Sequence, residues 1–227
     1  MMTSIFPFEL HITVGGCNSE DIQKFQTVCH NLGIKSIVLE LTSEFQDVMT
    51  SSVIVSDNEG AHAEARRISQ LLSNSGFTVI RQKIETVPWH PAALQDKFAS
   101  DQYFECHLSI KMSNSEKIQL QDFIKHNNLH LHLSKNIKKK LSNNDFIQMA
   151  TFRSDKQNHW SSEKFRSHID NLKHQLEKSE IIRPQSIEKE TIEFCLFDSN
   201  VNHDNSWLKK DQTIPKVSQF SELSVLA

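Results

Sequence analysis

A seven-residue pattern that occurs twice constrains the fold of this chain more than any other feature. Residues 8–14 read FELHITV and residues 104–110 read FECHLSI, and their histidines are 107 − 11 = 96 positions apart. In both segments apolar and polar residues alternate with period two, which indicates a strand with one buried and one polar face. Both polar faces carry Glu, His and a hydroxyl residue in the same order, so we expect these faces to form the functional site.

The segments that follow the two strands extend the similarity. Residues 18–23 read NSEDIQ and residues 114–119 read NSEKIQ, again 96 positions apart. An Asn-Ser pair before a helical pattern is typical of a helix start. Ungapped agreement through strand, turn and helix start indicates an internal duplication.

Each half is predicted to have the element order strand-helix-strand-strand-helix-strand, the pattern of a ferredoxin-like unit. The strands are expected at residues 8–14, 36–41, 49–56 and 77–85, and again at 104–110, 129–134, 146–153 and 186–197. The predicted fold class is therefore α+β, with two tandem duplicated ferredoxin-like (βαββαβ) units. We expect a bilobal molecule in which the polar sheet faces meet across a pseudo-twofold cleft, since such clefts are common ligand sites.

The predicted units cover residues 1–87 and 103–200. A linker over residues 88–102 contains two prolines, and residues 201–227 form a polar C-terminal tail. The second unit is about twelve residues longer than the first. We expect the extra residues near a lysine-rich loop at residues 138–140.

Composition excludes several classes of protein. The net charge of −3 gives no electrostatic signal for duplex nucleic acid. No apolar run approaches the ~20 residues that span a bilayer, and no secretory signal is visible, so we expect a cytoplasmic protein without a membrane partner. Four cysteines without a C-x-x-C pair fit reduced thiols, and the chain has no Gly-rich phosphate loop.

The candidate site residues follow from the strand pattern. In a ferredoxin-like unit the first strand lies beside the fourth, so polar residues of both strands share one face. For the first unit these residues are Glu9, His11, Thr13, Arg81, Lys83 and Glu85. For the second they are Glu105, His107, Ser109 and Glu193, with His130, His132, Thr151 and Arg153 as wall groups.

The motifs His11-Ile12-Thr13-Val14 and His107-Leu108-Ser109-Ile110 resemble those of the two-histidine phosphoesterase superfamily, which includes RNA cyclic phosphodiesterases. The resemblance implies a hydrolase without a cofactor that acts on a small phosphorylated molecule, such as a nucleotide or an RNA-end phosphate. It implies that one histidine is the general base and the other the general acid, while Thr13 and Ser109 hold phosphate oxygens. Substrate binding is expected from the nearby cations, which are Arg81, Lys83 and Arg153.

A second hypothesis starts from four residues on the first and last strand of each unit: His11, Glu85, His107 and Glu193. Two imidazoles and two carboxylates suit a divalent transition metal. This ligand scheme is similar to that of glyoxalase-type (vicinal oxygen chelate) enzymes, which implies a metal-dependent lyase, isomerase or hydrolase. Under this hypothesis the glutamates two positions before each histidine, Glu9 and Glu105, orient the imidazoles.

A third hypothesis assigns no catalysis to the site. Arg81, Lys83 and Arg153 would then recognise a small anionic ligand in a binding module. The simplest alternative to any function is that duplication preserved the paired trios in a polar interface between the units.

Overall fold

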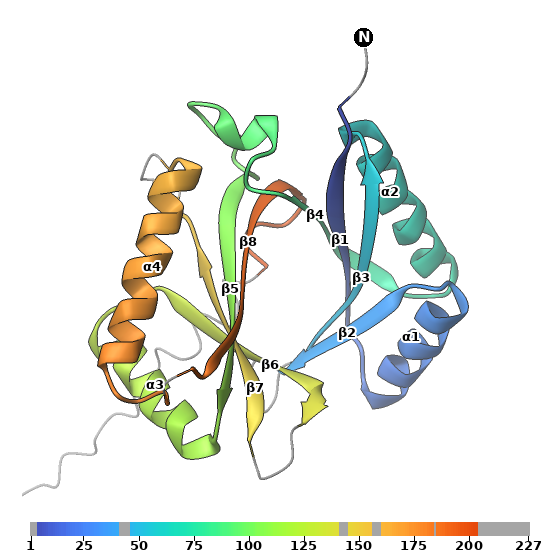
Figure 1. Ribbon diagram of the computed structural model, residues 1–227. Coiled ribbons are helices and arrows are strands. Elements are labelled where there is room, and N and C mark those ends of the chain that lie inside the picture. Colours follow the sequence, from blue (N-terminus) through green and yellow to red (C-terminus); the bar gives the residue numbers. More distant parts are fainter. Residues whose placement is uncertain (1–3, 41–45, 141–144, 156–159, 184, 204–227) are drawn as a thin grey trace, which may run out of the picture.

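The computed structural model describes residues 4–40, 46–140, 145–155, 160–183 and 185–203, with the backbone alone for residues 136–140. These residues form a mixed α+β fold with four α-helices and an eight-stranded antiparallel sheet (Figure 1). In chain order the elements are β1 (Phe6–Gly15), α1 (Ser19–Asn31), β2 (Lys35–Glu40), β3 (Gln46–Ser56), α2 (Asn58–Asn74), β4 (Thr78–Thr86), a 3-10 helix (Pro91–Leu94), β5 (Tyr103–Met112), α3 (Asn114–His126), β6 (Leu131–Lys140), β7 (Phe146–Arg153), α4 (Ser162–Lys178) and β8 (Ile187–Asp198).

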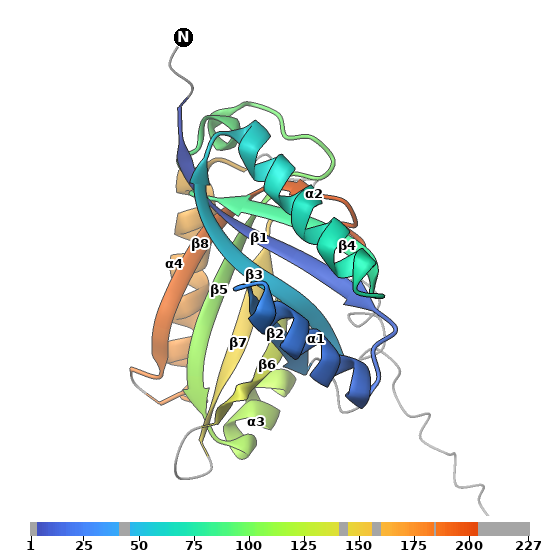
Figure 2. The same cartoon turned by 90° about the vertical axis from the view of Figure 1, so that its right-hand side faces the viewer.

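The helices cover the outer face of the strands. α1 and α2 lie on one side of the molecule and α3 and α4 on the opposite side (Figure 1), and Figure 2 shows α1 and α2 in front of the strands of the first half. The apolar residues of β1 face these helices, as the alternation predicted; they are Phe8, Leu10, Ile12 and Val14, each at most 3% exposed. Burial of each such side chain contributes about 1.5–3 kcal/mol to folding.

The helix starts repeat between the halves with a small difference. Asn18 is the N-cap of α1, and its side chain accepts a hydrogen bond from the backbone N–H of Asp21 at 3.0 Å. In α3 the N-cap is Ser113, one residue before the predicted Asn114. Both ends form capping boxes, which satisfy backbone N–H groups that the first helical turn leaves unpaired.

Strand order is the same in the two halves. The first half has the order β4-β1-β3-β2 and the second the order β8-β5-β7-β6. The halves pair at both edges, β4 with β8 and β2 with β6, so the eight strands close into a barrel. The two polar faces therefore enclose the interior of one barrel, where the sequence predicted an open cleft between two lobes. Edge pairing satisfies the backbone N–H and C=O groups that two separate sheets would leave open.

The extra residues of the second half are inserted at more than one point along the chain. Met49 pairs with Thr13 and Met149 pairs with Ser109, which is an offset of 149 − 49 = 100. At the last strands Glu85 and Glu193 are 193 − 85 = 108 apart. The prediction that the insertion lies in one loop near the lysines is therefore wrong, and β6 itself continues through Lys140.

The structure describes the whole of the predicted linker but only residues 201–203 of the predicted tail. The predicted linker over residues 88–102 connects β4 to β5 and contains the short 3-10 helix. Of the predicted tail, residues 204–227 lie outside the described part of the chain. Within the described residues, no helix combines the length and apolar composition that crossing a bilayer would require.

Candidate functional site

The interior of the barrel is a cavity of about 670 Å³. All eight strands contribute to its wall, because alternate residues of each strand point inward. Every site residue predicted from the sequence lines this one cavity: Glu9, His11, Thr13, Arg81, Lys83, Glu85, Glu105, His107, Ser109, Arg153 and Glu193. The polar trios of the two repeated strands thus face the same space.

Strand pairing arranges the inward side chains in three layers, of glutamates, of histidines, and of hydroxyl residues beside methionines. The cross-strand pairs are Glu9 with Glu85 and Glu105 with Glu193, then His11 with Lys83 and His107 with Thr191, then Thr13 with Met49 and Ser109 with Met149. The predicted equivalence of Glu85 and Glu193 is therefore confirmed by the register.

His11 is oriented by the backbone of β3. Its Nδ1–H donates a hydrogen bond to the carbonyl oxygen of Thr50 at 3.0 Å, because that oxygen can only accept. Nε2 then lies 3.1 Å from Glu85 Oε2 and 3.5 Å from Glu9 Oε1. Burial alone would lower the pKa of His11, but the hydrogen bond and charge of Glu85, with the charge of Glu9, raise it.

His107 occupies the equivalent position in the second half with a different balance of charges. Its Nδ1 lies 2.9 Å from Thr151 Oγ1, and its Nε2 lies 3.6 Å from Glu105 Oε2 and 3.7 Å from Glu193 Oε2. Burial lowers the pKa of His107 and outweighs the attraction of the nearby carboxylates. The two equivalent histidines are therefore shifted in opposite directions.

Glu85, His107 and Glu193 form a cluster of potential metal ligands. One donor atom from each lies within 4.8 Å of the other two, and the residues come from three different strands. Burial and the neighbouring charge of Glu85 raise the pKa of Glu193 to about 8. A bound divalent cation would offset this repulsion between the two carboxylates.

Two of the predicted substrate-binding cations neutralise Glu105. Lys83 Nζ pairs with Glu105 Oε2 and lies 2.7 Å from Glu85 Oε1. Arg153 Nη2 donates to Glu105 Oε1 at 2.9 Å. Burial would raise the pKa of Glu105, but Lys83 and Arg153 hold it well below its usual range. Glu105 is thus buried in an ion-pair network, whereas the equivalent Glu9 accepts a hydrogen bond from Ser51 Oγ at 2.7 Å.

Arg81, the third predicted cation, is bound to the end of β8. Its Nε donates to Asp198 Oδ1 at 2.9 Å and its Nη2 donates to Asp198 Oδ2 at 2.6 Å. Tyr103 Oη donates to the same Asp198 oxygen at 2.6 Å. This bidentate pair is the usual geometry of a strong Arg–carboxylate contact, so much of the charge of Arg81 is already used within the protein.

The structure adds residues that the sequence did not reveal. Thr50 orients His11 through its backbone carbonyl oxygen. Because every residue type has this group, the sequence could not identify the contact. Met49 and Met149 line the cavity beside the hydroxyl residues. Met149 follows from the alternation of the predicted strand at 146–153, in which Thr151 and Arg153 point to the same face.

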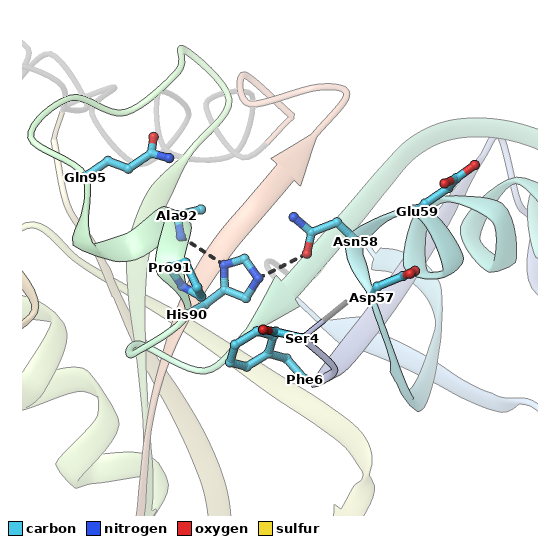
Figure 3. Close-up of a pocket in the computed structure, with 9 residues that line it drawn as sticks. All are labelled: Ser4, Phe6, Asp57, Asn58, Glu59, His90, Pro91, Ala92 and Gln95. Carbon is cyan, nitrogen blue, oxygen red and sulfur yellow. Dashed lines mark hydrogen bonds between the residues drawn. The ribbon is translucent and has the colours of Figure 1, made fainter. Parts of the chain in front are cut away.

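A second pocket, of about 420 Å³, lies outside the barrel where the linker meets the start of α2 (Figure 3). His90 stands at its centre, with Nδ1 accepting from Ala92 N–H at 3.1 Å and Nε2 lying 3.0 Å from Asn58 Oδ1. Nδ1 therefore binds within the linker, and Nε2 joins the linker to the start of α2. We assign this pocket a structural role.

The barrel cavity thus collects four histidines and four glutamates from both halves of the chain, since the predicted wall groups His130 and His132 line it together with His11 and His107. The predicted cations Arg81, Lys83 and Arg153 line it too, and carboxylates already bind them. The hydroxyl residues Thr13 and Ser109 line the same space one layer further along the strands. No family model, curated protein or solved structure matches the chain, so no relative assigns a role to these residues.

Proposed function

We propose that this protein is a metal-dependent enzyme that holds a divalent transition-metal ion with Glu85, His107 and Glu193. The observation that carries the proposal is the close approach of three donor atoms, all within 4.8 Å of one another inside the cavity. Donors about 2.0–2.2 Å from one ion lie about 3–4 Å apart, so small side-chain movements would complete this geometry. One imidazole and two carboxylates match the ligands of catalytic zinc and related ions.

The proposal also accounts for the repeat. The shared strand order and the equivalent His-Glu pairs support a tandem duplication of a ferredoxin-like unit. Under this proposal each half supplied one histidine and one inward glutamate from its last strand to a common centre. The halves then diverged, because Arg153 and Lys83 neutralise Glu105 whereas Glu9 keeps a partly exposed carboxylate.

Three protein ligands leave coordination positions open for a substrate oxygen, and the ion would polarise that oxygen or activate a bound water. His11 Nε2 lies 3.1 Å from Glu85 Oε2, so this imidazole stands beside one of the three proposed ligands. There it would exchange a proton with the substrate as a general acid or base. The reaction class is therefore a lyase, isomerase or hydrolase reaction at a carbonyl or related oxygen.

A metal-free phosphoesterase is the second candidate, and the opposite pKa shifts of the two histidines favour it. The raised pKa of His11 suits a general acid and the lowered pKa of His107 suits a general base. Phosphate would, however, enter a cavity in which Lys83 and Arg153 already form ion pairs with the carboxylate of Glu105. We therefore rank this candidate below the metal centre.

Calorimetric titration of chelator-treated protein with zinc tests the proposal. We expect one ion per wild-type chain, and an affinity at least about 100-fold lower in Glu193→Gln. Glu188→Gln is the matched control, because Glu188 lies on the same strand with an exposed side chain. Equal zinc affinity in wild type and Glu193→Gln would contradict the proposal.

Hydrolysis of a 2′,3′-cyclic nucleotide separates the two candidates. Turnover that persists in excess chelator and disappears in both His11→Ala and His107→Ala would establish the phosphoesterase and exclude the metal-dependent enzyme. We expect no turnover under these conditions.

A further inference from the structure

One wall of the cavity carries five apolar side chains although it faces away from the helices. They come from β2, β3 and β7 and are Ile37, Leu39, Met49, Ile147 and Met149, while β6, which lies between β2 and β7, adds the polar side chains of His132 and Ser134. None of the five belongs to the core packed under the helices. Four of them are only half-buried, so the cavity leaves this hydrocarbon surface partly open to solvent. Such a surface is costly to hydrate and favours an apolar ligand.

The apolar wall adjoins the histidine and glutamate layers. Met49 pairs with Thr13, two residues beyond His11 on β1, and Met149 pairs with Ser109, two residues beyond His107 on β5. Two residues of a strand span about 6.6 Å, so a molecule with one end at the histidines reaches the methionines with a chain of a few carbons. The two methionines occupy equivalent positions in the two halves.

We propose that the substrate is amphipathic. Its oxygen atoms would reach the proposed metal centre, and its flexible aliphatic chain would lie on the apolar wall. This inference rests on the proposed metal centre and specifies the substrate class of the same site. The cavity of about 670 Å³ has the size of sites that enclose small organic ligands, about 300–1,000 Å³. Methionine suits an aliphatic chain, because its unbranched side chain adapts to varied shapes.

The same wall is a poor platform for a flat aromatic group. Among the described residues that line the cavity, Phe152 is the one aromatic hydrocarbon side chain. It packs outward against Trp160 and Phe165, with ring centroids 6.2 and 5.7 Å away, and is only 6% exposed. An aliphatic chain therefore fits this wall better than a stacked base does.

A series of n-alkyl hydroxamates tests the inference, because the two hydroxamate oxygens bind zinc while the alkyl chain varies. Zinc-loaded protein is titrated with acetohydroxamate, butanohydroxamate, hexanohydroxamate and octanohydroxamate. We expect affinity to rise about fourfold for each added methylene that reaches the wall. In the double variant Met49→Gln and Met149→Gln, acetohydroxamate should bind as in wild type and the gain with chain length should disappear. Ile118→Gln, at an exposed position on α3, is the control.

Each outcome bears on one of the two claims. Equal affinity for short and long hydroxamates in zinc-loaded wild type would overturn the amphipathic substrate while leaving the metal centre intact. A gain with chain length that persists in the double variant would also overturn it. Failure of the protein to bind zinc, which is measured first and separately, would refute the proposed function, and the inference would fall with it.

Discussion

The ion pair between Arg81 and Asp198 joins β4 to the end of β8, and we expect Asp198→Asn to destabilise the fold strongly. Both side chains are at most 5% exposed. Two hydrogen bonds of 2.9 and 2.6 Å join them, and Tyr103 contributes a third contact. The variant removes the charge of Asp198 from beside a buried guanidinium. Removing one partner of such a pair costs about 3–5 kcal/mol. Because asparagine keeps an oxygen that can still accept a hydrogen bond, we expect a loss of about 3 kcal/mol in the free energy of unfolding.

The same pair predicts a pH dependence. Burial would raise the pKa of Asp198, but Arg81 and Tyr103 lower it from 3.8 to about 2. Because the folded pKa is depressed, this contribution is fully present above about pH 4 and is lost as the pH falls toward 2. A shift of this size corresponds to about 2 kcal/mol. The difference between wild type and Asp198→Asn should therefore shrink by about 1 kcal/mol between pH 7 and pH 3, which is about half of the full effect.

Urea unfolding at pH 7, 4 and 3 measures both effects. A loss of about 3 kcal/mol lowers the midpoint at pH 7 by about 1 M or more. Glu64→Gln is a matched control, because Glu64 forms a bidentate pair with Arg67 on the exposed face of α2, where such pairs contribute about 0–1 kcal/mol. If Asp198→Asn is no more destabilising at pH 7 than Glu64→Gln, the account of this pair is refuted.

Two further substitutions and one thiol titration have defined expected results. Thr151→Val removes the hydrogen-bond partner of His107 Nδ1 and should weaken zinc affinity about 10–100-fold in calorimetry; unchanged affinity would contradict the proposed role of His107. Lys83→Met removes one of the two cations that pair with the buried Glu105 and should lower the free energy of unfolding in urea by about 3–5 kcal/mol; a loss below about 1 kcal/mol would contradict this role of Lys83. Ellman's reagent should titrate Cys17 alone in the folded protein, since the other three thiols are buried, and all four in urea.

The local features of the fold could be predicted from the sequence because they depend on short periodic patterns. The alternation at residues 8–14 identified both the buried and the polar face of β1. The offset comparison identified Glu193 as the equivalent of Glu85, and strand pairing confirms it. These features need only the periodicity of a strand and a conserved order within the repeat.

The closure of the barrel could not be predicted in the same way. Periodicity assigns a face to each residue, but it does not say which edge strands pair with each other. Within the described residues, the β2–β6 seam pairs Leu39 with Asn136 and Glu40 with Lys135, and neither pair has a distinctive residue pattern. The sequence therefore placed the polar faces opposite each other but described the space between them as a cleft.

The ion pairs inside the cavity could not be predicted from the sequence either. The sequence predicts Arg81, Lys83 and Arg153 as substrate-binding cations, but it does not reveal the carboxylates with which the structure pairs them, Asp198 and Glu105. These partners lie 117, 22 and 48 positions apart in the chain, so only the folded structure shows the pairing.

Anomalous diffraction from crystals soaked with manganese or zinc tests the central claim most directly. We predict a single strong anomalous peak in the barrel, within bonding distance of Glu85, His107 and Glu193, about 2.0–2.2 Å from their donor atoms. The peak should be absent from Glu193→Gln crystals treated in the same way. An empty cavity in fully soaked wild-type crystals, or an ion bound elsewhere in the barrel without these three residues, would contradict the account.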